Sequence, residues 1–509
     1  MLILTHAQMR QLEQDTQSAG LSQSVLMERA ALAVAQKALA MTTETPGAIL
    51  VICGHGNNGA DGLAAARLLH AQGRAVTVWR LYHPKPTPML RAQARLAKAF
   101  GVAMVDIKNI TQLQTNAAQL QTIPSYALVI DAIAGIGLTR PPTGLWQAAI
   151  EALNRSQCRV LAVDVPSGVP ADGVWGAPVG RSTDKALDAP SGIPANEILA
   201  VRAHVTLALG HAKPGLLLMP LRGFAGELAV ADIGLLPVRE FTAIALDEAW
   251  LAAQLPPRPM EIHKNQLGHA GLIAGSAGMP GAAVLMTHGA LRGGAGLVTL
   301  YAQTLPNGLP PEAMWCGEDT ALSDFWQGKS ALGLGPGLGR QRVVACWVHR
   351  ALNEFPGKLL LDADALNALD AKPDALLAAS GRVVITPHPG EFSRLFGVAI
   401  AEILANPVAH AQRAAAKSGA VVVLKGATTV VARPQGPYAL YAGGNPGMAT
   451  PGSGDVLSGI ITALLAQGMS PWQAACCGVA LHGRAGNRAA ATQGQNAMSA
   501  GDIAENLCF

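Results

Sequence analysis

The residues Gly452-Ser453-Gly454-Asp455 stand directly before an apolar segment, 455–467, that is typical of a helix. Glycines let backbone N–H groups approach an anion at the positive end of a helix dipole, so this loop predicts phosphate binding. A carboxylate there repels phosphate but can take a proton from a hydroxyl that attacks it, which makes Asp455 a candidate catalytic base. The competing interpretation is an aspartate that only caps the helix. The glycine-rich stretch before it, 443–448, favours function.

Two more segments of the C-terminal half carry polar groups just after apolar runs. Lys425-Gly426-Ala427-Thr428-Thr429 offers a cation and two hydroxyls, which suit nucleotide phosphates and ribose, although a hairpin turn is the simpler interpretation. His388 lies between two prolines that fix its direction. A single histidine is often structural, but in a glycine-loop enzyme we expect a ligand contact here.

In the N-terminal half, the segment from Gly54 to Gly62 joins an expected strand to an expected helix. It lacks the Lys-Ser/Thr of a Walker A loop and is not the usual dinucleotide fingerprint. Its two amides, Asn57 and Asn58, can bind a ligand or offer a carbonyl oxygen to a hard cation. A plain tight turn is the alternative, and the paired asparagines with Asp61 favour function.

Asp131 and Asp164 each end an apolar run, and Ser167 follows the second. Because the carboxyl ends of parallel strands meet at one edge, both should face the same crevice as Asn58. Helix capping is the simpler alternative for an aspartate. Asn58, Asp131 and Ser167 together offer oxygen ligands for a monovalent cation, an option that spacing alone leaves open.

The elements that must position these residues alternate between strand and helix in both halves. A capping box at Thr5 opens a helix, and others are expected over 24–41, 61–72 and 455–467. The expected strands are 48–53, 75–79, 127–131, 160–164, 205–209, 226–230, 271–276, 359–364, 383–388 and 421–426. The range 331–339 is expected to begin as a strand and to end in a glycine turn. This alternation predicts doubly wound α/β domains with parallel sheets. A proline-rich break at 235–262 divides the chain into domains 1–240 and 241–509, and 168–194 is expected to be a surface excursion.

The bulk composition narrows the class of protein. Half of the 509 residues are apolar, the net charge is only +4, and there is no Lys/Arg run, so we expect no nucleic-acid partner. No stretch of about 18 apolar residues predicts a membrane span. The seven cysteines form no CxxC pair, which favours reduced thiols and a cytoplasmic protein.

Several motifs together resemble one family. Asn57 to Gly62, Asp164-Val165-Pro166-Ser167-Gly168 and Lys213-Pro214-Gly215 are similar to the NAD(P)H-hydrate epimerase domain. Leu361 to Asn367, Thr386 to Glu391 and Gly452 to Leu457 are similar to the ADP/ATP-dependent NAD(P)H-hydrate dehydratase domain. Their order resembles the fused bacterial repair enzymes over nearly the whole chain.

The resemblance implies a Rossmann-like three-layer α/β/α domain, 1–240, followed by a ribokinase-like α/β domain, 241–509. The first would interconvert the R and S hydrates of NADH or NADPH. The second would dehydrate the S hydrate with ADP, giving NAD(P)H, AMP and phosphate. Potassium is implied for the first domain and Mg²⁺ for the second. The partners would be these hydrates and ADP, in a homo-oligomer.

The resemblance also assigns residues. Potassium ligands would be Asn58, Asp131 and Ser167, and Asp164 or Asp131 would be the acid/base of epimerisation. Hydrate contacts in the first domain would be Asn57, Asn58, Gly59, Ala60, Asp61, Gly135, Ile136, Gly137, Leu138, Thr139, Arg140, Pro141 and Asp164. In the second domain the hydrate contacts would be Ala282, Gly337, Gly339, His388 and Asp455, and Asp455 would be the catalytic base. The nucleotide contacts would be Lys425, Gly426, Ala427, Thr428, Thr429 and Gly454.

Three departures from the family pattern concern the first domain. Ala60 and Ala31 replace usual glycines, and the segment Arg181–Ala195 is longer than usual. Two rival functions stay open. A small-molecule kinase would share the phosphate loop and Asp455, and a non-enzymatic scaffold would share the first fold. The choice of ADP or ATP, and of NADH or NADPH hydrate, is also open.

Overall fold

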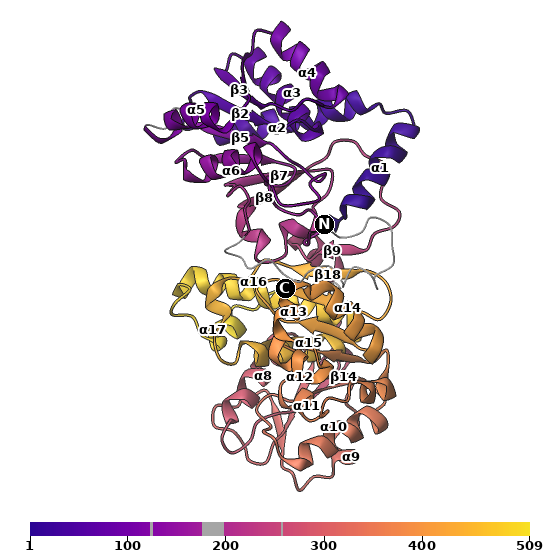
Figure 1. Cartoon of the computed structure of the whole chain (residues 1–509). Helices are drawn as coiled ribbons and strands as arrows, with labels where there is room; N and C mark the ends of the chain where they lie inside the picture. Colours follow the sequence, from indigo (N-terminus) through magenta and orange to yellow (C-terminus); the bar gives the residue numbers. More distant parts are fainter. Residues whose placement is uncertain (123–125, 176–197, 256–257) are drawn as a thin grey trace. The chain divides into compact units, whose positions relative to one another are not determined.

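The computed structural model describes residues 1–122, 126–175, 198–255 and 258–509 (Figure 1). Two compact units appear, Leu2–Phe241 and Thr242–Phe509 together with Met1. The expected segment Arg181–Ala195 and most of the excursion 168–194 lie outside the described residues. None of the helices within the described ranges has the length and hydropathy of a bilayer-spanning segment.

The first unit is built on a seven-stranded parallel sheet in the order β4-β3-β2-β5-β6-β7-β8. Its strands are β2 Ile49–Cys53, β3 Val76–Leu81, β4 Ala103–Ile107, β5 Leu128–Ala132, β6 Val160–Val163, β7 Val205–Leu209 and β8 Glu227–Ala231. The strand order reverses between β2 and β5. A parallel sheet binds its ligand outside the carboxyl ends of its strands at such a switch point.

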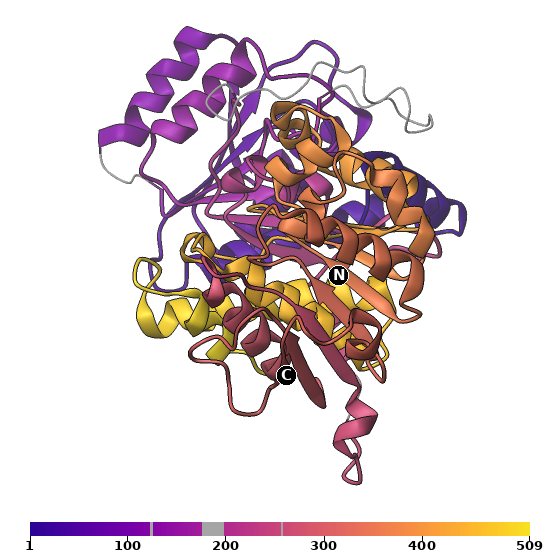
Figure 2. The same ribbon diagram turned by 90° about the horizontal axis from the view of Figure 1, so that it is seen from below.

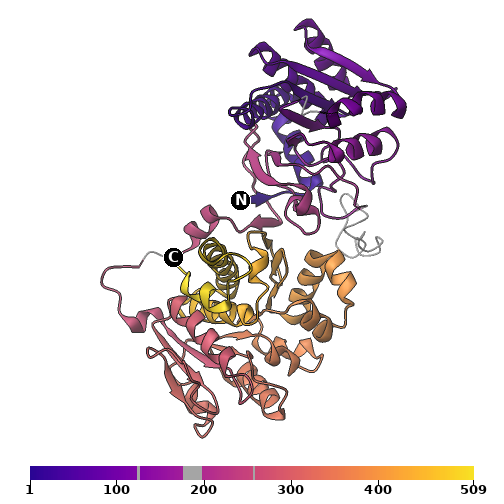
Figure 3. The same cartoon turned by 90° about the vertical axis from the view of Figure 1, so that its left-hand side faces the viewer.

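Helices cover both faces of this sheet, as Figure 3 shows. They are α1 His6–Ser18, α2 Gln23–Met41, α3 Asn57–Ala71, α4 Pro88–Ala99, α5 Ile110–Thr122 and α6 Leu145–Arg155. One apolar core lies under α2, α3 and α4, and a second lies under α5 and α6. The predicted three-layer α/β/α arrangement is thus confirmed.

The sheet of the second unit runs β9-β18-β17-β16-β15-β14-β13-β10-β11-β12. From β16 to β12 all neighbours are parallel, whereas β16, β17 and β18 pair antiparallel. The strands are β9 Ala243–Ala245, β10 His269–Ile273, β11 Leu297–Tyr301, β12 Met314–Cys316, β13 Ala331–Leu334, β14 Lys358–Leu361, β15 Val383–Ile385, β16 Val421–Leu424, β17 Thr429–Ala432 and β18 Tyr438–Tyr441.

The helices of the second unit also enclose its sheet (Figure 2). They are α7 Glu248–Gln254, α8 Pro280–Arg292, α9 Leu322–Phe325, α10 Arg342–Glu354, α11 Asp364–Asn367, α12 Pro389–Phe396, α13 Ile400–Ala405, α14 Pro407–Ser418, α15 Ser453–Ala466, α16 Pro471–Gln493 and α17 Ala500–Glu505. The helix α15 packs closely on α8 and α16 and on strands β10, β13 and β14. It is apolar and almost wholly buried, so its first turn is fixed at the carboxyl edge of the sheet.

One local prediction is wrong, and one alternative interpretation is excluded. The helix α3 begins at Asn57 rather than at Asp61, because Gly56 serves as its N-cap and both asparagines occupy its first turn. Asp455 does not cap α15: the N-cap is Gly452, and Asp455 lies inside the first turn. The capping box at Thr5 is confirmed, with Gln8 as its partner.

Candidate active sites

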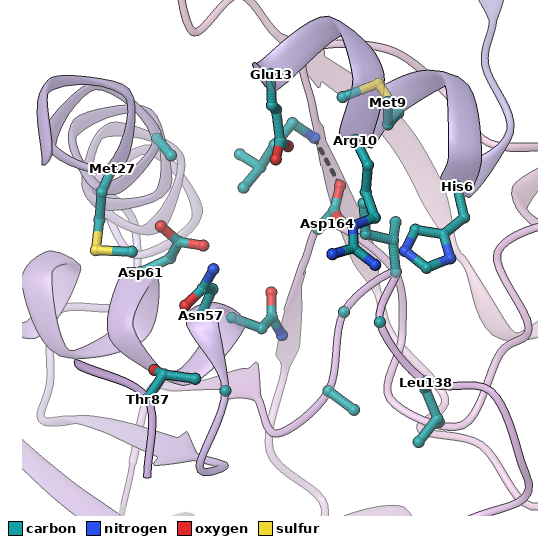
Figure 4. Close-up of a pocket in the computed structure, with 18 of the residues that line it drawn as sticks. His6, Met9, Arg10, Glu13, Met27, Asn57, Asp61, Thr87, Leu138 and Asp164 are labelled. Carbon is teal, nitrogen blue, oxygen red and sulfur yellow. Dashed lines mark hydrogen bonds between the residues drawn. The ribbon is translucent and has the colours of Figure 1, made fainter. Parts of the chain in front are cut away.

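A cavity of about 430 Å³ opens at the switch point of the first unit (Figure 4). The loops after β2 and β5 form part of its wall, as the strand order requires. The predicted substrate residues that line it are Asn57, Asn58, Asp61, Gly135, Ile136, Gly137, Leu138 and Asp164. The lining of the cavity thus collects residues that lie more than a hundred positions apart in the sequence.

The other predicted substrate residues do not line this cavity. Thr139, Arg140 and Pro141 are exposed. Ala60 is a buried residue of α3 and belongs to the apolar core of this unit. A side chain at Gly59 would come within 2.2 Å of the carbonyl oxygen of Gly54, so this glycine is needed for close packing of the loop.

Asp164 follows β6 directly and is fixed by a buried lysine. Its backbone has φ 70°, which is uncommon for a residue other than glycine. Its carboxylate accepts hydrogen bonds from the Nζ of Lys213 and, at 3.1 Å, from the N–H of Leu209. Lys213 is completely buried and donates also to the Leu209 carbonyl. The strained backbone and the hydrogen bond from the buried lysine fix the position of this carboxylate at the cavity wall.

Asp131 lies behind the cavity wall and is completely buried. It accepts hydrogen bonds from the hydroxyl and N–H of Ser167, at 2.6 and 2.8 Å, and from the N–H of Ile133. Burial raises the pKa of Asp131 to about 6, although these hydrogen bonds oppose the shift. Neither Asp131 nor Asp164 caps a helix, so that simpler interpretation is wrong for both.

The three residues predicted to hold potassium lie near one another. Asn58 approaches Gly135, since a side chain built there would meet its Oδ1 at 3.0 Å. The hydroxyl of Ser167 bridges Asp131 and the N–H of Ala134. The Nδ2 of Asn58 is buried without a partner, and Asp131 forms no ion pair with any described residue. A buried carboxylate without a counterion fits a cation with oxygen ligands, whereas the unpartnered Nδ2 of Asn58 is a donor and does not bind one.

Helix α1 supplies cavity residues that the sequence did not indicate. His6, Arg10 and Glu13 lie on one face of the helix and reach into the space next to Asp164 (Figure 4). Burial raises the pKa of Glu13, with Asp164 adding to the shift. The helical spacing of these residues marked a polar face, but only the fold shows that this face meets the end of β6.

In the second unit, a buried charge network lies at the carboxyl ends of β14, β15 and β16. Lys425 donates to the Oδ1 of Asp362 at 2.8 Å, and the hydroxyl of Ser458 donates to Oδ2 at 2.7 Å. Glu391 lies 3.9 Å from Lys425 and 3.4 Å from His388. Asp362, Glu391 and Ser458 had no predicted role, although Asp362 ends a strand just as Asp131 and Asp164 do.

Lys425 to Thr429 form the turn of a β-hairpin, because Leu424 pairs with Val430 in antiparallel register. The simpler interpretation of this segment is thus confirmed, and its predicted nucleotide contacts remain compatible with it. Burial disfavours the charge of Lys425, but Asp362 and Glu391 outweigh that effect and raise its pKa. The turn therefore presents a permanent cation.

Asp455 and Gly454 stand beside this cation. A side chain built on Gly454 would come within 3.4 Å of Lys425 Nζ. The backbone N–H of Gly454 has no acceptor in the described part of the chain, so it is free to donate to an anion at the N-terminus of the helix. Burial raises the pKa of Asp455 to about 7, aided by Asp362, Asp364 and Glu391 and opposed by Lys425. Such a carboxylate takes up and releases a proton near neutral pH.

The remaining predicted contacts lie at the ends of β13 and α8. Gly337 approaches Ala282, whose methyl group would lie 2.7 Å from a side chain at this glycine. The N–H of Gly339 donates to Asp364 Oδ2 at 2.8 Å. His388 is half exposed, and its Nδ1 accepts from the N–H of Gly390, so its ring is fixed.

Comparisons with known proteins agree in both halves. The family model described as NAD(P)H-hydrate dehydratase matches residues 270–508, and the YjeF-related protein N-terminus model matches residues 23–215. Among solved structures, the ADP/ATP-dependent NAD(P)H-hydrate dehydratase of Bacillus subtilis, co-crystallised with ATP/Mg²⁺, is 32% identical. It covers 52% of this chain and 95% of its own, with a TM-score of 0.45. A ribokinase-like superfamily protein of Enterococcus faecalis is 29% identical, covering 53% and 95%, with a TM-score of 0.48.

Curated relatives align along the full chain. The bifunctional NAD(P)H-hydrate repair enzyme of Moorella thermoacetica is 36% identical over 100% of this chain and 96% of its own length. That of Escherichia coli is 36% identical over 90% of this chain and 84% of its own. The predicted Rossmann-like and ribokinase-like fold class and the predicted repair function are confirmed, and the chain belongs to the family of bifunctional NAD(P)H-hydrate repair enzymes.

Proposed function

We propose that the cavity of the first unit, within domain 1–240, epimerises the hydrates of NADH and NADPH. The loop at Asp455, within domain 241–509, dehydrates the S hydrate with ADP. The observation that supports this division most directly is that each unit has its own activated carboxylate at the carboxyl edge of its own sheet. Asp164 is held by Lys213 in one unit, and Asp455 lies beside Lys425 in the other.

In the dehydration, Asp455 takes the proton of the hydroxyl group on the hydrated ring. The oxygen attacks the terminal phosphate of ADP, and AMP leaves. The bond from the ring carbon to the phosphate oxygen then breaks as the ring nitrogen donates its electron pair, so that inorganic phosphate is released. The neighbouring ring carbon gives up a proton to water, which forms the double bond of NAD(P)H. The amide of Gly454 and the ammonium group of Lys425 are placed to stabilise the phosphates. Gly426, Ala427, Thr428 and Thr429 hold the rest of the nucleotide, while Ala282, Gly337, Gly339 and His388 hold the hydrate.

Mg²⁺ would enter this site together with the nucleotide. No group of three or more His, Cys, Asp or Glu side chains that could hold a metal occurs among the described residues. Mg²⁺ is commonly bound by substrate phosphates and one or two carboxylates, so a preformed cage is not required. When bound, it neutralises phosphate charge. ADP is the proposed phosphate donor to the deprotonated hydroxyl group, with ATP as the alternative donor.

In the epimerisation, the geometry favours Asp164 over Asp131 as the group that takes the hydroxyl proton. Asp164 lines the cavity, whereas the oxygens of Asp131 are engaged by Ser167 and Ile133. Asn57 to Asp61 and Gly135 to Pro141 contact the hydrate in this proposal. Asn58, Asp131 and Ser167 hold K⁺, whose charge offsets that of the buried carboxylate and fixes the loop after β5.

The direct test is to incubate the full chain with NADPH hydrate and ADP. Recovery of NADPH absorbance, with one AMP and one phosphate formed per NADPH, is expected. Stable transfer of phosphate from ATP to an unrelated alcohol, without NADPH recovery, would instead indicate a kinase. Requirement for K⁺ is tested by exchanging it for a bulky organic cation, which should slow only the R-to-S conversion.

A cytoplasmic location and a homo-oligomeric state complete the proposal. The seven cysteines are all free, which suits a reducing compartment. Fluorescent tagging in cells and light scattering of the purified chain test these two points. Hydrates and ADP are the proposed partners, with no role for nucleic acid or membrane.

A further inference from the structure

Three carboxyl groups from different elements line the cavity of the first unit. Glu13 comes from α1, Asp61 from α3 and Asp164 from the loop after β6 (Figure 4). Among the cavity's lining residues, the buried cation is Lys213. Several carboxylates in one partly desolvated space cannot all be ionised at little cost, so at least one keeps its proton.

The buried cation, Lys213, already forms an ion pair with one of the three carboxyl groups. Lys213 donates to Asp164, which therefore carries the negative charge. The carboxyl group of Asp61 has no hydrogen-bond or ion-pair partner within the described ranges, and the residue is only partly exposed. A half-buried carboxyl group that no described residue neutralises is the one that retains a proton.

The surroundings distinguish Asp61 from Glu13. Burial, Asp164 and Glu13 all raise the pKa of Asp61, well above its ordinary value. Burial and Asp164 raise that of Glu13 too, but Lys213 and Arg10 oppose the shift. Two further basic groups at the cavity, His6 and Arg10, stand on α1, the helix that carries Glu13. Burial lowers the pKa of His6 and that of His55, which also lines the cavity. Asp61 is therefore the better proton donor.

We infer that Asp61 is a catalytic acid that works with Asp164 as base, and that the pair epimerises the hydrate by opening its ring. This inference rests on the proposed epimerase function of the cavity. The two groups stand on different walls of one space, which lets one reach the hydroxyl of the hydrated carbon while the other reaches the ring nitrogen.

The proton and electron balance of the step is closed. The Asp164 carboxylate takes the hydroxyl proton, the oxygen forms a carbonyl with the hydrated carbon, and the bond from that carbon to the ring nitrogen breaks. The electron pair goes to the nitrogen, which receives the proton of Asp61. Rotation of the aldehyde group exposes its other face, and the same transfers in reverse close the ring in the opposite configuration. Nothing is oxidised or reduced.

The test uses the full chain, whose second site provides an internal control. In Asp61→Asn the amide keeps the shape but has no acidic proton, so R-to-S conversion should fall by about 100-fold or more. Dehydration of pure S hydrate by the same preparation should stay within twofold of the unaltered chain. The matched control Asp106→Asn, at an exposed position of β4, should leave both rates unchanged. Asp61→Glu should restore part of the epimerisation.

Several results would overturn the inference. Epimerisation by Asp61→Asn within threefold of the unaltered chain would remove Asp61 as the acid. If Asp61→Asn fails to fold, inactivity of a folded Asp61→Glu would also contradict it, since a carboxyl group is retained there. In contrast, an unaltered chain that does not accelerate R-to-S conversion would contradict the proposed function itself.

A second measurement follows the bond that breaks. Without ADP, R hydrate is epimerised in water enriched in heavy oxygen. Ring opening keeps the original oxygen on carbon, so the S hydrate should contain none of the label early in the reaction. Uptake of one labelled oxygen per epimerisation event would show that hydroxide leaves and water re-adds, and would refute the ring-opening step.

Discussion

At the scale of single residues, Asp455 is subject to opposing charges. Burial, Asp362, Asp364 and Glu391 raise its pKa to about 7, and Lys425 alone counteracts them. As a base Asp455 must be ionised, so dehydration should slow by about tenfold for each pH unit below about 7 and level off above it. The pH dependence of kcat, with ADP and S hydrate saturating, measures this.

The pKa of Asp455 should also respond when the positive charge of Lys425 is removed. In Lys425→Met, the opposing charge is lost, so the pKa of Asp455 rises further and the half-maximal pH of kcat moves upward. An unchanged or lowered half-maximal pH would show that Lys425 does not act on Asp455. Lys372→Met, at an exposed lysine far along the chain from this turn, serves as control and should leave the profile unaltered.

The raised pKa of Asp455 should also affect the stability of the second unit. Its folded-state pKa lies above the unfolded value, so ionisation destabilises the fold as pH rises from about 4 to about 7, and the loss is complete above that. Asp455→Asn removes this cost. It should lower dehydration by about 1,000-fold or more, and yet raise the melting temperature of the second unit at pH 8 but not at pH 4. A lower melting temperature at pH 8 would contradict the assignment.

At the scale of elements, the sequence indicated many of the strands because they are short apolar runs, several with a polar residue at the end. It did not indicate β4, β9, β11, β12, β17 or β18. Asp131, Asp164 and Lys425 were found in this way. The start of α3 was missed because two asparagines and a glycine disfavour helix, and only packing against the Gly54 loop overrides that preference. The sequence did not indicate which part of the fold the polar face of α1 would contact, because its partners are set by tertiary contacts.

The first turn of α15 allows a sharp test of the phosphate loop. Gly454→Ala adds a methyl group 3.4 Å from Lys425 Nζ, in the space where a phosphate would lie, at a helical position that alanine tolerates. The KM for ADP should rise by about tenfold or more, with little change in melting temperature. An unchanged KM would place the phosphates elsewhere.

The neighbouring Gly452→Ala provides the contrast. This glycine has φ 85°, and a side chain would come within 2.3 Å of Leu285. The substitution should destabilise the second unit by about 1–3 kcal/mol, lowering its melting temperature before any specific change in KM. Equal effects of the two alanines would show that Gly454, too, is required only for packing.

Helix α1 offers a second test at this scale. Its capping box joins Thr5 and Gln8, and Thr5→Ala should cost about 1 kcal/mol of local helix stability. Because α1 carries His6, Arg10 and Glu13 to the cavity, the KM for R hydrate should rise severalfold, whereas dehydration of S hydrate is unaffected. Ser18→Ala, at the exposed end of the same helix, is the control. Faster hydrogen exchange in α1 without a change in KM would exclude the helix from substrate binding.

At the scale of the whole molecule, each unit has its own sheet, its own cores and its own candidate site. The order of motifs along the sequence predicted this division, because each half repeats the alternation of strand and helix with a separate set of glycine loops. The charge network of Asp362, Glu391 and Ser458 was not predicted, since its members are spread over almost a hundred residues and meet only through parallel register.

Two separate sites imply that the hydrate can pass between molecules through solution. A chain carrying Asp164→Asn should convert only the S fraction of a mixed hydrate at the normal rate, and one carrying Asp455→Asn should convert none. An equimolar mixture of the two variants should convert both epimers, because S hydrate made by one chain is free to reach the intact second site of the other. The time course of NADPH recovery checks this. If recovery in the mixture stops once the S fraction is consumed, S hydrate made by one chain does not reach the second site of another chain.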